Sequence, residues 1–420
     1  MVPNGWKSTR LNKIAETVTS GSRDWAQYYS ESGSKFIRMT NLPRDGIYLK
    51  LDDLKYVNVH SNSSDGKRTS LKEGDLLISI TAELGKIGWV PPALGEAYIN
   101  QHTALVRIKK ESAYSKYIAY LLSSHAMNHK INRLNDSGAK AGLNLPTIRS
   151  IPMVLPPLPE QRKIANILST WDNAISTTER LIEASKQQKK ALMQQLLTGK
   201  KRLVNPETSK AFEGEWEEVK LGDISTITRL AGAEYSDIWE TKENGEIIAL
   251  RGFNIGQNKL ILRNLERIDN QLSLKLSRSR LSKNDIVFPC VGSIGKACLI
   301  TEDGKFHINQ NIAKITPSQN VIPLFLTFCL LSKRSEAQIL QYNTSSSQPN
   351  VLVGNLRKFK FNVPSTSKEQ EKIATVLTAA DKEIEALEAK LAHFKQEKKA
   401  LMQQLLTGKR RVKVDEMEVA

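Results

Sequence analysis

KKALMQQLLTGK occupies residues 189–200 of this chain, and the same twelve letters return at residues 398–409. Upstream, EQRKIA at 160–165 aligns at the same offset of 209 residues with EQEKIA at 369–374. The match continues for about 45 residues without a gap. A period of half the chain is too long for a solenoid. The sequence therefore indicates one module that has been duplicated once.

Apolar residues recur along both copies at alternating steps of three and four, which over about five heptads is typical of a coiled-coil seam. Trp171 aligns with Ala380 and Ser185 with Phe394. This alternation of large and small residues favours pairing of the two different helices within one chain. The seam does not reveal orientation, but a two-fold relation between duplicated halves would make the pair antiparallel. The predicted seam and partner interface contains Ile164, Leu168, Trp171, Ile175, Leu192, Leu196, Ile373, Leu377, Ile384, Leu391, Phe394, Leu401 and Leu405.

Both ends of these helices carry boundary signals. Ser367 followed by Gln370 predicts a capping box, and Pro159 suits a first helical turn. Gly199 and Gly408 are placed as left-handed caps at the other end. Each helix should contain about 40 residues and extend about 60 Å.

Two globular modules of similar length but weak likeness surround the helices. Short β-rich runs that end in Gly or Asn turns predict strand-led mixed folds, and Ile-Asn-Gln at 99–101 recurs at 308–310. We predict an α+β protein with two mixed α/β domains, two long helices in an antiparallel coiled coil, and pseudo-two-fold symmetry. The expected segments are a first module 1–157, a first helix 158–199, a linker 200–212, a second module 213–365, a second helix 366–409 and a tail 410–420.

The chain is strongly basic, with 61 Lys and Arg against 44 Asp and Glu and a formal charge of +17. Such a balance favours a polyanionic partner, because each cation that meets a phosphate releases counterions; the alternative is solubility alone. Three cysteines without a CxxC pair argue against a disulfide framework or a zinc ribbon. The apolar run 321–331 is too short for a bilayer. We expect a soluble, cytoplasmic protein with no membrane partner.

Motifs for catalysis are missing from the sequence. Residues 292–296 (GSIGK) resemble a phosphate loop faintly, but Ala297 stands where Ser or Thr should bind Mg²⁺, so a tight turn is the better interpretation. His125 and His129 are four residues apart, yet no third metal ligand is evident, which favours an ordinary histidine pair. We therefore expect a non-catalytic chain with no catalytic residue and no metal site.

A loop rich in small polar residues precedes each long helix, at 135–144 and 342–350. Small residues let the backbone approach phosphates and bases, and amides can donate to groove edges; an ordinary solvent loop would look similar. Arginine–asparagine pairs at 38 and 41 and at 251 and 254 are further candidates. The predicted DNA-binding residues are Arg38, Asn41, Ser137, Lys140, Asn144, Arg251, Asn254, Ser346, Gln348 and Asn350.

This layout resembles the specificity subunit of type I restriction–modification systems. The resemblance rests on two divergent modules, each followed by a near-identical helix that is entered through PPLPEQRKIA or PSTSKEQEKIA and closed by LLTGK. It covers essentially the whole chain. Asp75 and Asp285 also fit the target recognition domains of that family. The second proline-rich entry is eroded to Val-Pro-Ser-Thr at 363–366.

The resemblance implies that each module reads one half of a bipartite double-stranded DNA site and that the helices fix the spacing. It also implies two modification subunits that methylate adenine with S-adenosylmethionine, and restriction subunits that use ATP and Mg²⁺. This chain would hold no cofactor of its own. Two other classes stay open: a stand-alone duplicated DNA-binding regulator and a coiled-coil adaptor for proteins.

Overall fold

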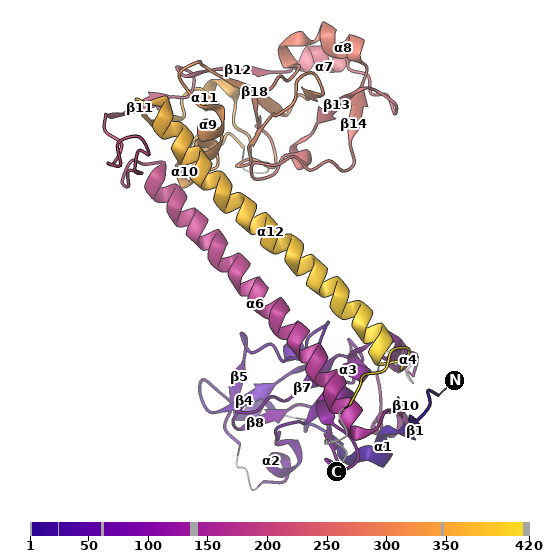
Figure 1. The fold of residues 1–420 in the computed structure, drawn as a ribbon. Coiled ribbons are helices and arrows are strands. Elements are labelled where there is room, and N and C mark those ends of the chain that lie inside the picture. The colour runs from indigo at the N-terminus through magenta and orange to yellow at the C-terminus, as the bar shows by residue number, and fades with distance from the viewer. Residues whose placement is uncertain (1, 24, 60–62, 135–141, 346–347, 415–420) are drawn as a thin grey trace. The chain divides into compact units, whose positions relative to one another are not determined.

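A computed structural model describes residues 2–23, 25–59, 63–134, 142–345 and 348–414. The chain divides into two compact units, the first made of Met1–Glu179 with Lys390–Ala420 and the second of Arg180–Ala389. The long helices α6 (Leu158–Leu196) and α12 (Ser367–Leu405) each contribute one half to either unit (Figure 1). Within the described ranges, no helix is long and apolar enough to cross a membrane.

In the described part of the first unit, the strands form an antiparallel sheet in the order β2-β9-β6-β7, a sheet β3-β5-β4-β8 with β4 parallel to β8, and a pair β1-β10. The strands are β1 (Lys7–Arg10), β2 (Ala15–Ser20), β3 (Tyr29–Ser30), β4 (Ser34–Ile37), β5 (Lys55–Val57), β6 (Leu76–Ser79), β7 (Ile87–Trp89), β8 (Ala97–Ile99), β9 (Thr103–Ile108) and β10 (Pro152–Leu155). The short helices are α1 (Leu11–Ile14), η1 (Trp25–Tyr28), η2 (Met39–Asn41), α2 (Ser64–Thr69), α3 (Ser115–Ser123), α4 (His125–Arg133) and α5 (Leu145–Ser150).

The second unit repeats this arrangement with sheets β12-β18-β15-β16 and β14-β13-β17 and the pair β11-β19. Its strands are β11 (Trp216–Lys220), β12 (Ser225–Arg229), β13 (Ile247–Leu250), β14 (Glu266–Ile268), β15 (Ile286–Pro289), β16 (Cys298–Leu299), β17 (Phe306–Ile308), β18 (Ile312–Pro317) and β19 (Lys360–Pro364). Its short helices are α7 (Gly232–Ile238), η3 (Gly252–Asn254), α8 (Asn270–Lys275), η4 (Ser277–Ser279), α9 (Pro323–Leu330), α10 (Lys333–Tyr342) and α11 (Val353–Leu356).

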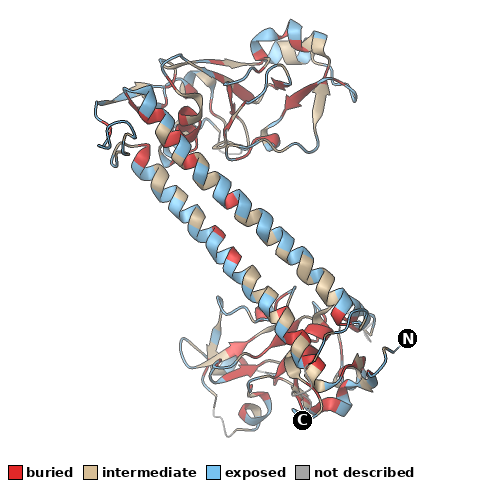
Figure 2. Ribbon diagram, viewed as in Figure 1, coloured by how far each residue is buried: buried red, intermediate tan, exposed pale blue. Residues whose placement is uncertain are grey.

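The two modules share one topology although their sequences have diverged. The parallel pair β4–β8 corresponds to β13–β17, and both antiparallel sheets have the same strand order. Apolar residues of these sheets, such as Ile78 and Val106 in the first unit and Phe288 and Ile315 in the second, form the cores. Figure 2 shows these buried strands in red. The predicted strand-led mixed fold is confirmed.

Contacts between α6 and α12 run in opposite directions within each unit. In the first unit, Asp172 and Glu179 of α6 pair with Lys398 and Lys395 of α12. In the second, Lys186 and Lys189 of α6 pair with Glu388 and Asp381. Ascending positions on one helix thus meet descending positions on the other, so the helix halves are antiparallel in either unit.

The predicted seam is the shielded side of both helices. Ile164, Leu168, Leu196, Leu377 and Leu405 are fully or almost fully buried, and the other predicted seam residues are buried or half-buried. Trp171 packs edge-on against Phe394, with 5.5 Å between ring centroids. The large residues of the seam thus meet each other in the first unit, while the aligned small residues, Ser185 and Ala380, belong to the second. Supercoiling of the whole pair stays a prediction.

The ends of the helices follow the sequence signals in part. Gly199 and Gly408 have φ of +71° and +70°, the left-handed conformation that suits glycine. The backbone N–H groups of Lys201 and Arg410 donate to the carbonyls of Gln195 and Gln404, which closes both last turns alike. These caps are confirmed.

The predicted capping box is wrong. The side-chain oxygen of Gln370 accepts from the backbone N–H of Ile322 at 2.8 Å, and its amide donates to the carbonyls of Pro364 and Asn320. Gln161 does the same in the first unit, accepting from Tyr114 at 2.9 Å and donating to Pro156. The repeated glutamine therefore ties each helix to its own module.

The glutamate before that glutamine closes each unit through an arginine from elsewhere in the chain. Glu160 forms a two-pronged ion pair with Arg411, at 2.7 Å for both bonds. Glu369 does so with Arg202, at 2.6 and 2.7 Å. Both carboxylates are almost fully buried. Arg202 thus ties the segment predicted as a linker, 200–212, into the second unit, as Arg411 ties its own segment into the first.

A lysine–aspartate contact between the long helices recurs in both units, but its surroundings differ by one hydroxyl group. In the first, Asp172 accepts from Lys398 at 2.5 Å and from the hydroxyl of Tyr120 at 2.6 Å. Burial, reinforced by the charge of Asp172, raises the pKa of Tyr120, so the phenol keeps the proton it donates. In the second, Asp381 keeps its lysine, Lys189, but Phe328 replaces the tyrosine. One buried oxygen of Asp381 is left without a hydrogen-bond partner in the described residues.

This difference predicts opposite effects of two matched substitutions. Tyr120→Phe should lower the free energy of unfolding by about 1.5–3 kcal/mol, because a hydrogen bond to the half-buried Asp172 carboxylate is lost. Phe328→Tyr should raise it by about 1 kcal/mol by supplying the missing donor. Urea unfolding of the full chain measures both. Loss of stability in both variants would show that the ring sites tolerate no exchange and would contradict this account.

Candidate nucleic-acid interface

Four polar loops meet at one end of the first unit's antiparallel sheet. They are 38–44 after β4, 80–86 after β6, 100–102 between β8 and β9, and 142–144 before α5; we call them the first edge. Their backbones are bonded to one another, since Ile80 donates to the His102 carbonyl at 3.1 Å and Leu143 donates to the Ile80 carbonyl at 2.9 Å. The 38–44 turn joins them through the ion pair of Arg44 with Glu83.

The corresponding loops of the second unit meet in the same way. They are 251–254 after β13, 290–297 after β15, 309–311 between β17 and β18, and the described residues of 343–350; we call them the second edge. Cys290 donates to the Asn311 carbonyl at 2.8 Å, and Val351 donates to the Cys290 carbonyl at 2.9 Å. These two bonds repeat the pair seen in the first edge, which makes the convergence a property of the duplicated fold.

Close backbone approach is built into the first edge. A Cβ atom on Gly21 would lie 2.1 Å from the carbonyl carbon of Asn100, so only glycine fits there. His102 sits in a short chain of side-chain bonds, with Thr81 Oγ1 2.8 Å from its Nδ1 and Gln101 Nε2 3.1 Å from its Nε2. Because the amide nitrogen of Gln101 can only donate, Nε2 of His102 accepts and its Nδ1 carries the proton toward Thr81. The bond to His102 fixes the position of the Gln101 amide on the first edge.

Asn41 and Asn254 were predicted to contact DNA, and the structure corrects this. Both are buried, and each amide oxygen accepts from the backbone N–H three residues earlier, at 2.9 and 3.0 Å. Both amide hydrogens are used too, by Lys50 and Asp53 carbonyls in one case and by Ile261 and Arg263 carbonyls in the other. With every donor occupied, these side chains shape the turns rather than face a groove.

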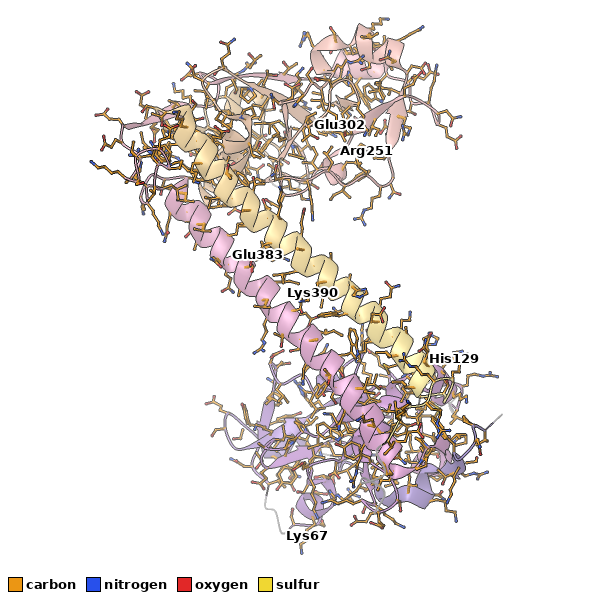
Figure 3. All side chains as sticks on the ribbon, in the orientation of Figure 1. Lys67, His129, Arg251, Glu302, Glu383 and Lys390 are labelled. Carbon is orange, nitrogen blue, oxygen red and sulfur yellow. The ribbon has the colours of Figure 1, made fainter. Side chains whose placement is uncertain are left out.

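The two predicted arginines lie on the edges but are partly engaged. Arg38 pairs with Asp53 at 3.1 Å, and its side chain is 22% exposed. Arg251, labelled in Figure 3, is 51% exposed and stands 3.6 Å from Glu266. Arg251 also lies over the ring of Phe253. It is therefore the freer of the two cations to meet a phosphate.

The remaining predicted residues divide by location. Asn144 caps α5, its oxygen accepting from Thr147 at 2.8 Å. Gln348 is exposed on the second edge, and Asn350 bridges to Val291 while its own backbone N–H donates to Asn343 at 2.9 Å. The predictions at Ser137, Lys140 and Ser346 lie outside the described residues.

Sequence reasoning left out the turn that joins the two sheets in each unit. Residues 100–102 and 309–311 follow the parallel strands β8 and β17 and lead into β9 and β18, so both sheets end there. The repeated Ile-Asn-Gln tripeptide was the available signal. Gln101 and Gln310 are thus additional candidates for reading a ligand, since glutamine amides both donate and accept.

Charge at the first edge is partly neutralised. Glu83 bonds Lys86 at 2.5 Å and Arg44 at 3.3 Å, and these hydrogen bonds lower the pKa of its carboxyl. The second edge contains Arg251 and Lys296, and Lys296 forms no ion pair with a described residue. The two edges therefore offer amides and hydroxyls together with a modest number of cations, a set suited to hydrogen-bond readout.

Metal-ligating and nucleophilic side chains do not cluster in the described ranges. These ranges contain no cluster of three or more His, Cys, Asp or Glu residues that could hold a metal. His125 and His129 are both exposed on α4. Burial raises the pKa of the Cys290 and Cys298 thiols to about 11 and about 12, so these cysteines are not nucleophiles at neutral pH. The 292–296 segment is a turn between β15 and β16.

Comparisons with known proteins point to one family. A sequence model of the type I restriction modification DNA specificity domain matches residues 3–186 and 213–395. The type I restriction enzyme MjaVIII specificity subunit of Methanocaldococcus jannaschii is 30% identical, covering 98% of this chain and 94% of its own length. The EcoBI specificity subunit of Escherichia coli is 22% identical, with 89% and 79% covered.

A crystal structure of the S subunit of a type I restriction–modification system from M. genitalium has the same fold. It superposes with a TM-score of 0.60 at 12% identity and covers 96% of both chains. A structure from work on assembly of a type I R-M system superposes with a TM-score of 0.57 at 16% identity, covering 97% of this chain and 98% of that one.

The corrected role of the buried asparagines predicts a stability effect. Asn41→Ala and Asn254→Ala should each lower the free energy of unfolding by about 3 kcal/mol, because buried backbone groups lose their partners. Gln348→Ala, at an exposed position of the second edge, should change it by less than about 0.5 kcal/mol. Urea unfolding compares the three. Unchanged stability of both asparagine variants would show that these amides are not needed to hold the turns, and would contradict their structural role.

Proposed function

This chain belongs to the family of type I restriction–modification specificity subunits, and we propose that it selects a bipartite DNA site for a modification and restriction complex. The observation that carries the proposal is the recurrence of one polar edge in both units. Each edge joins three of its four loops by the same two backbone bonds, although the modules around them have diverged. Equivalent frames with different side chains are suited to reading two different short sequences.

Each edge would enter the major groove over one half-site. Gln101 and Gln310 would read base edges, because a glutamine amide can pair with adenine N6 and N7. Arg251 and Lys296 would contribute phosphate contacts, which position the protein without reading sequence. The +17 charge of the chain would strengthen association in a salt-dependent way.

The helices α6 and α12 would set the distance between the half-sites. Each contains 39 residues and so extends about 58 Å. Two readers joined by a stiff connector bind one duplex with a high effective concentration when the connector matches the spacing of the sites. Half-sites on one face of the duplex recur about every 34 Å, and unread bases would separate them.

The reaction itself would belong to partners. We place adenine methylation, with S-adenosylmethionine, in modification subunits that dock on the helix pair, and ATP- and Mg²⁺-dependent translocation and cleavage in restriction subunits. This chain would then be a non-catalytic subunit without a cofactor of its own. Two modification subunits per chain would match its duplication.

Substitutions at the repeated turn test the half-site assignment. Gln101→Ala should relax base preference in one half-site and Gln310→Ala in the other, each with a loss of about 1–3 kcal/mol at a single base pair. Selection from a random DNA pool followed by sequencing reads both preferences. A uniform loss of affinity, with both preferences intact, would place these glutamines on phosphates. An unchanged affinity would remove them from the interface.

The spacing role has its own test. Seven residues inserted into each helix, after Glu179 in α6 and after Ala389 in α12, add about 10 Å, or about three base pairs at 3.4 Å each. The unread gap of the selected DNA should lengthen by that amount while both half-sites stay the same. An unread gap of unchanged length would show that the helices do not set the distance between the half-sites.

A further inference from the structure

A groove with a volume of about 1070 Å³ lies within the first unit. One wall is formed by α4 with the strand pair β1–β10, and the other by α6 and the last turns of α12. Figure 3 labels His129 of α4 beside those turns. The volume exceeds that of most small-ligand pockets, which hold about 300–1,000 Å³. The groove therefore has the capacity for a peptide segment.

Four positions keep this groove open. Ser8, Ala126, Pro152 and Val154 line it, and none of them carries a charge. Ser8 lies on β1, Ala126 in the first turn of α4, and Pro152 and Val154 on β10. Their small or apolar side chains leave the surface between α4 and β10 hollow.

The duplicated positions of the second unit carry polar residues that bond to one another. By strand register and the matching serine caps of α4 and α10, they are Glu218, Arg334, Lys360 and Asn362. Arg334 bonds Asn362 at 2.7 Å and also Glu218, and Lys360 bonds Glu218 at 2.8 Å. A charged cluster thus covers the surface that is hollow in the first unit.

The floor of the groove is apolar and adaptable. Met127, Met153 and Met402, three of the seven methionines of the chain, line it together with Ile175. Methionine fits irregular partners because its unbranched thioether has several rotatable bonds, and it is frequent on surfaces that receive helices. An apolar floor offers neither cations nor hydrogen-bond donors, which are the groups that bind a phosphate backbone.

The rim of the groove is cationic. Lys395 and Lys398 are paired with Glu179 and Asp172. Lys130, Lys399 and Lys409 also line the groove, are exposed, and make no ion pair with any residue in the described ranges. They outnumber the one lining carboxylate that has no such pair either, the exposed Asp45. An apolar floor below three unpaired cations is complementary to a helix with an apolar face and acidic flanks.

We propose that this groove is a docking site for an acidic amphipathic helix of a protein partner, and that the first unit alone provides it. The inference goes beyond the proposed function, because duplicated helices by themselves would give every partner two equivalent sites. Here the divergence of four positions makes the two halves unequal. A partner that uses the groove would bind once per chain and break the equivalence of the halves.

The test uses the full chain and a fluorescein-labelled peptide of about 18 residues, with Leu and Met at helical spacing and Glu on the flanks. Fluorescence anisotropy measures its dissociation constant. One control peptide has the same composition with the apolar spacing scrambled, and another has Lys in place of Glu. Both controls should bind about tenfold more weakly or worse.

Variants locate the site. Transplanting the second unit's residues by Ser8→Glu, Ala126→Arg, Pro152→Lys and Val154→Asn should weaken binding about tenfold or more. Ala126→Arg alone, at an exposed helical position, should do most of this if the fourfold variant does not fold. Lys399→Ala should weaken binding about threefold. Its duplicate in the second unit, Lys190→Ala, should leave binding unchanged.

Several results would overturn the proposal. These are equal binding by the transplanted or the Ala126→Arg variant, an equal effect of Lys190→Ala, or equal binding of the scrambled peptide, which would indicate general attraction of polyanions. Displacement of the peptide by a short DNA duplex through the same residues would assign the groove to nucleic acid. A gain of about tenfold on deletion of residues 415–420 would assign it to the chain's own acidic tail.

Discussion

Each unit depends on a buried glutamate at the start of one long helix that is held by an arginine beyond the end of the other. Glu160 meets Arg411 and Glu369 meets Arg202, with both prongs of each pair at 2.6–2.7 Å. Removing one member would leave a buried charge without its partner, which is costly. The start of α6 must therefore lie beside the end of α12, and the reverse, so that the duplicated sequence enforces antiparallel helix halves in both units.

The two units share this frame but differ in the side chains at equivalent positions. The backbone bonds that join three loops at each edge are kept, while His102 in the first edge corresponds to Asn311 in the second. The contact of Asp172 with Tyr120 is lost at Phe328, and the hollow between α4 and β10 is filled in the second unit by Arg334 and its partners. A shared scaffold with unshared contacts is what the proposed recognition of two unlike half-sites would require.

Periodicity and repetition were sufficient to predict the long helices, their seam and the glycine caps, because these depend on residues close in sequence. The edges could not be predicted in the same way. They arise where β4 runs parallel to β8 and β9 pairs with β6, pairings between strands about 30 to 60 residues apart that no local pattern encodes. Asn41 was misassigned for a related reason: a polar residue beside Arg38 looks available until the carbonyls of Lys50 and Asp53 are brought against it.

The most direct test is methylome sequencing of a host that carries this gene and its neighbours, compared with a host that lacks this gene alone. The account predicts that N6-methyladenine disappears at one motif made of two short half-sites separated by unread bases. An unchanged methylome, with the neighbouring methyltransferase confirmed active, would contradict the assignment and favour a stand-alone DNA-binding regulator.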